Sequence, residues 1–168
     1  MIEMELVGVR VELPSNVPIV LLQEQQGDRR VLPILVGQPE ATAIAFALDK
    51  VVTPRPMTHD LLKDLLGQLD ATLERVVVTE LKERTFYAEL HLSGPAGDIV
   101  VSSRPSDAMA LAVRTGTPIF ANEGVLDDAG YVDDDEVATV PDTDDDPDQM
   151  VADFAKFIEQ VNPDDFGS

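Results

Sequence analysis

The first part of the chain predicts three β-strands joined by short turns. Apolar and charged positions alternate along residues 2–13, and the alternation changes phase near Val7, which indicates a β-bulge or a change of burial. A turn signal at residues 14–16 separates this strand from a second at residues 18–25, and a third follows at residues 29–36. Because the connections are short, we expect the three strands to form a meander.

Two helices are expected after this meander. Pro39 and Glu40 follow Gly37 and suit the first turn of a helix, whose apolar stripe continues to Leu48. Thr58 is predicted to cap a second helix through its hydroxyl group. We expect this second helix to face a core through its leucines at positions 61, 62, 65, 66 and 69.

The second part of the chain repeats the same order of elements. Strands are predicted at residues 73–81, 85–92 and 98–103, again with short connections. A third helix is expected to start at Ser106, and it is apolar on nearly every side, so we expect it to be buried. A short last strand is expected at residues 117–121. The fold class is therefore α+β, with one antiparallel or mixed sheet and three main helices covering one side.

The first and third predicted helices begin with similar sequences. Residues 40–45 read EATAIA and residues 107–112 read DAMALA, so an acid and alanines recur at matching positions. Each segment follows a strand and a proline. This match predicts an internal duplication of a strand–helix unit. We expect Glu40 and Asp107 to occupy similar environments related by a pseudo-twofold axis.

The charge divides the chain into three segments. The net charge is −20, but residues 1–122 hold 16 acids and 11 basic residues, so their net charge is only −5. We predict a domain over residues 1–130, an acidic flexible linker over residues 131–148 and an amphipathic helix over residues 149–168. The acidic tail is either a solubilising linker or a mimic of nucleic acid that occludes a cationic groove.

Composition excludes several classes of protein. The chain has no cysteine, which removes disulfides, thiolate metal sites and a cysteine nucleophile. The first residues are acidic where a signal peptide would be basic, and the longest apolar run, residues 41–48, is too short to span a membrane. We expect a cytoplasmic protein without a membrane partner.

Two short motifs carry the candidate chemistry. Residues 55–60 read RPMTHD and residues 104–107 read RPSD, so each places an arginine, a proline, a hydroxyl group and an acid at a predicted helix start. Histidine exchanges protons near neutral pH, arginine grips phosphate with two nitrogens, and helix starts present free N–H groups to anions. Oxygen ligands favour Mg²⁺ or Mn²⁺ over zinc.

Phosphodiester cleavage requires a base or metal, positive charge on the phosphoryl oxygens, and help for the leaving group. The candidates for catalysis are His59, Asp60 and Asp107. The candidates for substrate binding are Arg55, Arg104, Thr58 and Ser106. The candidates for holding the metal ion are Glu40, Asp60 and Asp107.

These motifs resemble those of the bifunctional nuclease family, small bacterial and plant proteins named for cleaving both DNA and RNA. The resemblance covers most of residues 1–125 and rests on five ordered motifs, at residues 32–41, 55–60, 85–88, 104–112 and 118–120. It implies a nuclease that hydrolyses phosphodiester bonds of DNA and RNA with low sequence specificity. It also implies a homodimer.

An alternative interpretation makes the chain a non-catalytic binding or regulatory protein. In this interpretation Thr58 and Ser106 are helix caps, and the arginines of the two motifs form structural ion pairs with Asp60 and Asp107. The net charge of −5 over residues 1–122 favours it, as does Ser102, where the resemblance leads us to expect an acid. A binder of small anions or nucleotides is a third interpretation, although the chain has no Gly-x-Gly phosphate loop.

Overall fold

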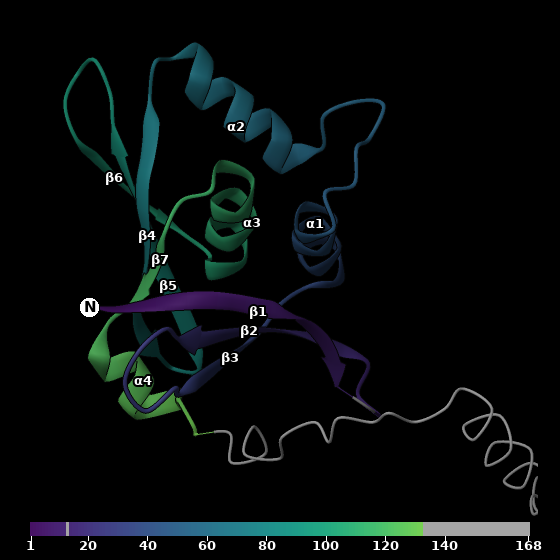
Figure 1. The fold of residues 1–168 in the computed structure, drawn as a ribbon, viewed down its shortest axis with the longest axis vertical. Coiled ribbons are helices and arrows are strands. Elements are labelled where there is room, and N and C mark those ends of the chain that lie inside the picture. Colours follow the sequence, from purple (N-terminus) through teal and green to yellow (C-terminus); the bar gives the residue numbers. More distant parts are fainter. Residues whose placement is uncertain (13, 133–168) are drawn as a thin grey trace, which may run out of the picture. The chain divides into compact units, whose positions relative to one another are not determined.

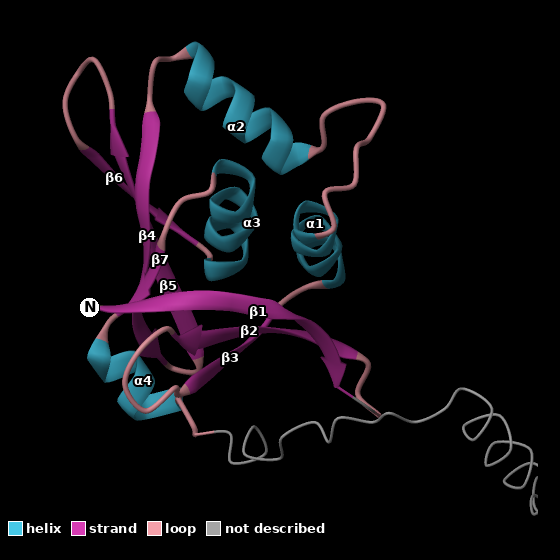
Figure 2. Cartoon of the chain, in the orientation of Figure 1, coloured by secondary structure: helices cyan, strands magenta, loops and turns pink. Residues whose placement is uncertain are grey.

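The computed structural model describes residues 1–12 and 14–132. They form a seven-stranded mixed sheet with four helices, so the predicted α+β class is confirmed (Figures 1 and 2). The predicted linker and terminal helix lie outside the described residues, apart from Tyr131 and Val132. No described helix has the length and the apolar character that a membrane span requires.

The elements follow the predicted order closely. The strands are β1 (Ile2–Glu12), β2 (Val17–Glu24), β3 (Val31–Leu35), β4 (Thr72–Lys82), β5 (Thr85–Ser93), β6 (Ile99–Ser103) and β7 (Ile119–Ala121). The helices are α1 (Gln38–Leu48), α2 (Thr58–Gln68), α3 (Pro105–Thr115) and α4 (Glu123–Ala129). The bulge predicted near Val7 is confirmed, because the pairing of β1 with β2 shifts between Leu6 and Gly8.

The sheet supports the predicted duplication. Its order is β3-β2-β1-β7-β4-β5-β6. An antiparallel three-stranded meander therefore lies on each side of β7, and the first strand of each meander, β1 or β4, is the one next to β7. β7 runs antiparallel to β1 and parallel to β4, so these two strands run in opposite directions. This order and these directions are consistent with a pseudo-twofold axis near β7 that relates the halves, and each half is completed by a helix, α1 or α3.

The core lies between the sheet and the helices α1 and α3, which contact each other (Figure 1). Residues 108–112 of α3 are almost completely buried, which confirms the prediction for this helix. The buried residues of α1 are Ala41, Ala43 and Ile44. The alanines in both helices allow a close approach to one another and to the strands.

Two predictions about α2 are wrong. Its N-cap is Met57, so Thr58 is the first helical residue and its side chain caps nothing. Its leucines do not face a core: only Leu66 packs against the buried cluster, and the others are 41–68% exposed. The reason is that α1 and α3 already cover the sheet, so α2 contacts the remaining surface of α3 and the end of β4 (Figure 1).

The prediction of three main helices missed α4. This short helix lies on the other side of the sheet from the first three (Figure 1) and buries Val125 and Leu126. Arg30 anchors it through ion pairs with Glu123 and Asp127, at 2.7 and 2.9 Å. The same guanidinium pairs at 2.8 Å with the buried carboxylate of Glu24, whose pKa it holds below the usual value through a hydrogen bond.

Candidate active site

The first turns of α1, α2 and α3 meet around a cavity of about 210 Å³. Prolines in the first turns of α1 and α3 suit helix starts because their missing N–H has no partner there in any case. Four charged or titratable side chains line the cavity, and all four were singled out from the sequence: Glu40, His59, Arg104 and Asp107. They come from three helices and from both halves of the duplicated fold.

Arg104 holds the two carboxylates together. Its Nε and Nη2 donate to the two oxygens of Asp107 at 2.6 and 2.9 Å, and Nη2 also donates to Glu40 Oε1 at 3.0 Å. The third guanidinium nitrogen, Nη1, forms no hydrogen bond to any residue that the structure describes. Because 65% of the Arg104 side chain is exposed, a ligand in solvent can reach this nitrogen.

Asp107 also binds the buried imidazole of His59. The distance from Nε2 to Asp107 Oδ1 is 3.1 Å. Burial favours the neutral form of Asp107, but hydrogen bonds from Arg104 and His59 outweigh it, so the pKa of Asp107 is lowered. An ionised carboxylate only accepts hydrogen bonds, so His59 donates from Nε2 and its Nδ1 is the nitrogen that can accept a proton.

Asp60 lies apart from this group. Its Oδ1 accepts from Arg114 Nε at 2.5 Å, and its Oδ2 accepts from the backbone N–H of Met57 at 2.9 Å. Arg114 is the main reason that the pKa of Asp60 is lowered. Asp60 follows His59 by one residue, which turns the two side chains about 100° apart around the helix. It lines a different cavity, of about 290 Å³, and not the one that contains His59.

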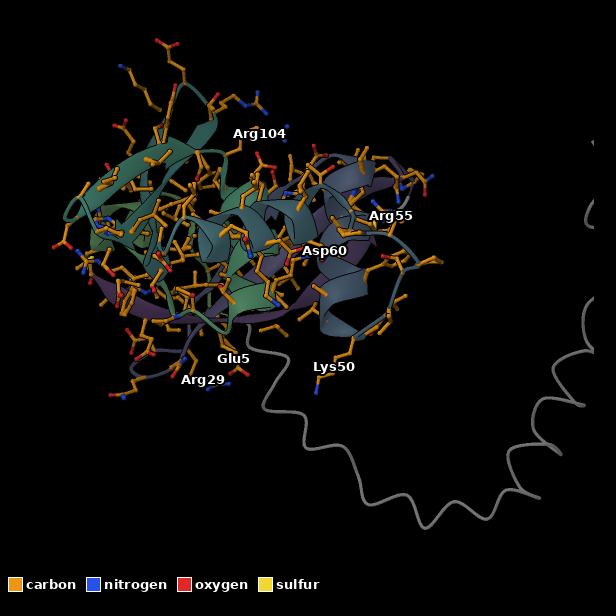
Figure 3. All side chains as sticks on the ribbon, turned by 90° about the horizontal axis from the view of Figure 1, so that it is seen from above. Glu5, Arg29, Lys50, Arg55, Asp60 and Arg104 are labelled. Atoms are coloured by element: carbon orange, nitrogen blue, oxygen red, sulfur yellow. The ribbon has the colours of Figure 1, made fainter. Side chains whose placement is uncertain are left out.

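The predicted ion pairs divide in the same way. The pair between Arg104 and Asp107 is confirmed. The prediction of a pair between Arg55 and Asp60 is wrong, because Asp60 pairs with Arg114 of α3 instead. Arg55 lies exposed in the loop between α1 and α2 (Figure 3), where its carbonyl oxygen accepts from the hydroxyl group of Thr53 at 2.7 Å.

The two hydroxyl residues are not helix caps. Thr58 is exposed and lines the cavity of the four charged groups. Ser106 is buried one residue inside α3, whose N-cap is Arg104, and no side chain caps that helix. Both residues still lie in first turns, where backbone N–H groups have no partner within the helix. Their predicted role toward an anion, which uses the backbone N–H groups, therefore stays a prediction.

The three predicted metal ligands do not converge. Among the described residues, no group of three or more His, Asp and Glu side chains is placed to hold one ion. Glu40 and Asp107 lie on the same guanidinium, whereas Asp60 binds Arg114. Mg²⁺ commonly uses one or two carboxylates together with substrate phosphates, so the pair Glu40 and Asp107 is the part of the predicted set that fits such an ion.

Comparison with known proteins places the chain in a family. Residues 20–134 match the bifunctional nuclease domain, and the chain belongs to this family. An uncharacterized protein of Mycobacterium tuberculosis (strain H37Rv) is 46% identical over 167 residues, which cover 98% of this chain and 97% of that protein. Bifunctional nuclease 2 of Arabidopsis thaliana is 32% identical over 116 residues, covering 66% of this chain and 35% of the plant protein.

A second plant relative gives the same picture. Bifunctional nuclease 1 of Arabidopsis thaliana is 30% identical over 109 residues, which cover 63% of this chain and 34% of the plant protein. The chain thus spans about a third of the length of these two plant relatives. The family resemblance drawn from the five sequence motifs is confirmed.

Proposed function

We propose that this chain is a nuclease that hydrolyses phosphodiester bonds of DNA and RNA with low sequence specificity. The observation that carries the proposal is the cluster of His59, Asp107 and Arg104 around one cavity. It combines a base and an exposed cation, each of which is hydrogen-bonded to the same carboxylate, Asp107. Membership in the bifunctional nuclease domain family supports the reaction class.

Each side chain has a distinct part in the reaction. His59 accepts a proton from the attacking water at Nδ1, while Asp107 holds its Nε2–H and stabilises the imidazolium that forms. Arg104 directs Nη1 to a phosphoryl oxygen, where negative charge increases in the transition state. The free N–H groups at the starts of α1 and α3 add partial positive charge beside it.

Glu40 and Asp107 are the residues that we assign to a divalent metal ion, Mg²⁺ or Mn²⁺. A bound ion supplies positive charge to the phosphoryl group in a domain whose own charge is negative. The homodimer stays a prediction. The exposed leucines of α2 are the surface that favours it, because large apolar side chains at 41–68% exposure gain free energy when a second copy covers them.

The alternative, a non-catalytic binding protein, is also favoured by one observation. Both acids of the two motifs are already paired with arginines, Asp107 with Arg104 and Asp60 with Arg114. Such pairs satisfy the charges without any ligand. A folded protein that cleaves neither DNA nor RNA would favour this alternative.

A cleavage assay separates the two functions. Labelled single-stranded and duplex DNA and RNA would be incubated with the protein in Mg²⁺, in Mn²⁺ and in chelator. We expect His59→Asn to reduce the rate by about 10²–10⁴-fold, the usual contribution of a general base. His91→Asn is the matched control, because His91 binds Arg75 and Glu89 through its two ring nitrogens and does not line the cavity. Cleavage that is equal in both variants contradicts the proposal.

A further inference from the structure

A second cavity, of about 340 Å³, lies beside the candidate active site and shares Arg104 with it. Three segments line it: residues 33–37, which are the end of β3 and its connection to α1, residues 84–86 at the start of β5, and residues 104–106 at the start of α3. Because the guanidinium of Arg104 borders both cavities, a ligand that extends from one to the other must pass it.

The charge of this second cavity differs from that of its neighbours. Arg84 and Arg104 line it, and no acid does. Three other cavities of the described residues, of about 550, 290 and 210 Å³, are each lined by at least two carboxylates. In a chain with a net charge of −20, a cavity lined by cations alone favours an anionic ligand.

Arg84 is free to bind such a ligand. It lies at the tip of the turn between β4 and β5, in the left-handed conformation, with φ of 65°. Its side chain is exposed, and no described residue forms an ion pair with it. Arg104 differs, because its charge is already shared by Asp107 and Glu40. Arg84 is therefore the stronger candidate for a direct phosphate contact.

The remaining wall of the cavity is apolar. Phe86 of β5, which is half-buried, and Pro33 and Leu35 of β3 line it. Leu35 is 64% exposed although it belongs to a strand of the sheet, which leaves a large apolar side chain at the rim. A planar aromatic ring beside an aliphatic side chain is a surface on which a nucleic-acid base can stack.

The size of the cavity limits the ligand. At about 340 Å³ it lies at the small end of the range for small-molecule sites, which begins at about 300 Å³. One nucleotide fills such a space. A base within a duplex would have to leave its stack and its partner to enter, which costs a few kcal/mol, whereas a base of a single strand is already free.

We propose that this cavity binds one unpaired nucleotide of the substrate strand, next to the phosphate that the candidate active site cleaves. Arg84 contacts the phosphate of that nucleotide, and the base lies against Phe86 and Leu35. The inference rests on the proposed nuclease function and adds a substrate class to it: single-stranded nucleic acid is bound in preference to duplex. Arg104 then lies between the two consecutive phosphates.

Binding in the absence of cleavage tests this site. Fluorescence anisotropy of the full chain would be measured with a labelled single-stranded thymidine dodecamer, with its duplex, and with thymidine monophosphate as a competitor, all in chelator. We expect tighter binding of the single strand than of the duplex. Arg84→Gln should weaken single-strand binding about tenfold and lower the slope of log Kd against log salt by about 0.7, the value for one lost phosphate contact.

Two further variants sharpen the result. Arg10→Gln on β1 removes the same charge from an exposed position outside both cavities, and it should change Kd less than twofold. Phe86→Leu keeps an apolar side chain in the core but removes the aromatic ring. It should weaken binding of the dodecamer about tenfold and leave binding of an abasic dodecamer unchanged.

The outcomes distinguish this site from the proposed function. If the protein cleaves nucleic acid and Arg84→Gln binds no differently from Arg10→Gln, the second cavity is not a subsite and the nuclease stands. If thymidine monophosphate binds but the dodecamer does not, the cavity serves a free nucleotide and the strand assignment is wrong. If the protein neither binds nor cleaves any of these probes, both proposals are overturned.

Discussion

The two halves of this domain are built alike but carry different chemistry. The N-cap of α1 is Gly37 and the N-cap of α3 is Arg104, and their backbones are nearly identical, with φ and ψ of −72° and 157° against −73° and 143°. Three residues later each half places an acid, Glu40 or Asp107. The same backbone geometry thus carries a glycine in one half and an arginine in the other.

This difference explains the asymmetry of the site. At Gly37 an added Cβ would collide with the carboxylate of Glu40, which folds back over the start of its own helix. Arg104 instead extends from its half to both acids. His59 comes from outside the duplicated units, and of the two acids it binds Asp107. The duplication supplies two similar carboxylates. The position of His59, which lies outside the repeat, determines which of them binds the candidate base.

The largest expected effect compares the two acids directly. Asp107→Asn should reduce nuclease activity about a thousandfold. The neutral amide no longer fixes the tautomer of His59 in which Nδ1 accepts a proton, and it removes the negative charge that pairs with Arg104. Glu40→Gln should cost only about tenfold, since Glu40 touches Arg104 but not His59. Measurement of kcat/KM for both variants and for the natural chain gives the two losses. Equal losses would show that the two halves contribute alike and would break the comparison.

A smaller effect is expected at the N-cap that lacks a side chain. Gly37→Ala should move the Glu40 carboxylate away from Arg104, lowering activity several-fold and the free energy of unfolding by about 1 kcal/mol. The matched control is Gly67→Ala in α2, where no atom lies within 4 Å of the added Cβ. There the better helix propensity of alanine should raise stability by up to about 1 kcal/mol. Urea denaturation of both variants measures the contrast, and two variants of equal stability would contradict it.

The smallest effect concerns the acid that lies outside both units. The pKa of Asp60 is lowered in the folded state, so its pairing with Arg114 stabilises the protein above the unfolded pKa of about 3.9. This contribution is lost as the pH falls through the lower folded pKa. Asp60→Asn should therefore destabilise the protein by about 1 kcal/mol or less at pH 7, because the carboxylate is partly exposed.

The pH dependence tests the sign of this effect. In urea denaturation the difference between Asp60→Asn and the natural chain should shrink steadily as the pH falls below about 4. Asp64→Asn, one turn along α2 and exposed, should differ little from the natural chain at any pH. A difference for Asp60→Asn that stays constant from pH 7 to pH 3 would mean that Arg114 does not set the pKa of Asp60.

Much of the fold followed from local patterns. Local sequence patterns predicted all seven strands, and the phase change near Val7 pointed to the bulge, because these features depend mainly on neighbouring residues. The match between residues 40–45 and 107–112 predicted the duplication. It placed Glu40 and Asp107 at equivalent helix starts, and both acids contact Arg104 there.

What depends on distant partners was not predictable in this way. A stripe of leucines on α2 shows that one face is apolar, but not that α1 and α3 have already covered the sheet. Arg114 reaches Asp60 from 54 residues away along the chain, and no spacing within the motif at residues 55–60 indicates it. His59 and Asp107 are separated by 48 residues, and only their shared position at helix starts suggested that they meet.

The position of β7 has a consequence for how the chain folds. This three-residue strand is added at the centre of the sheet, where Ile2 pairs with Ala121 and Val76 pairs with Ile119. Each half can form its own hairpins early from local contacts, but the sheet becomes continuous only when residues 119–121 arrive between them. Such distant pairings carry a large loop-closure entropy and slow the rate-limiting step. We therefore expect the two meanders to form first, during synthesis, and the continuous sheet to form only after β7 has been made.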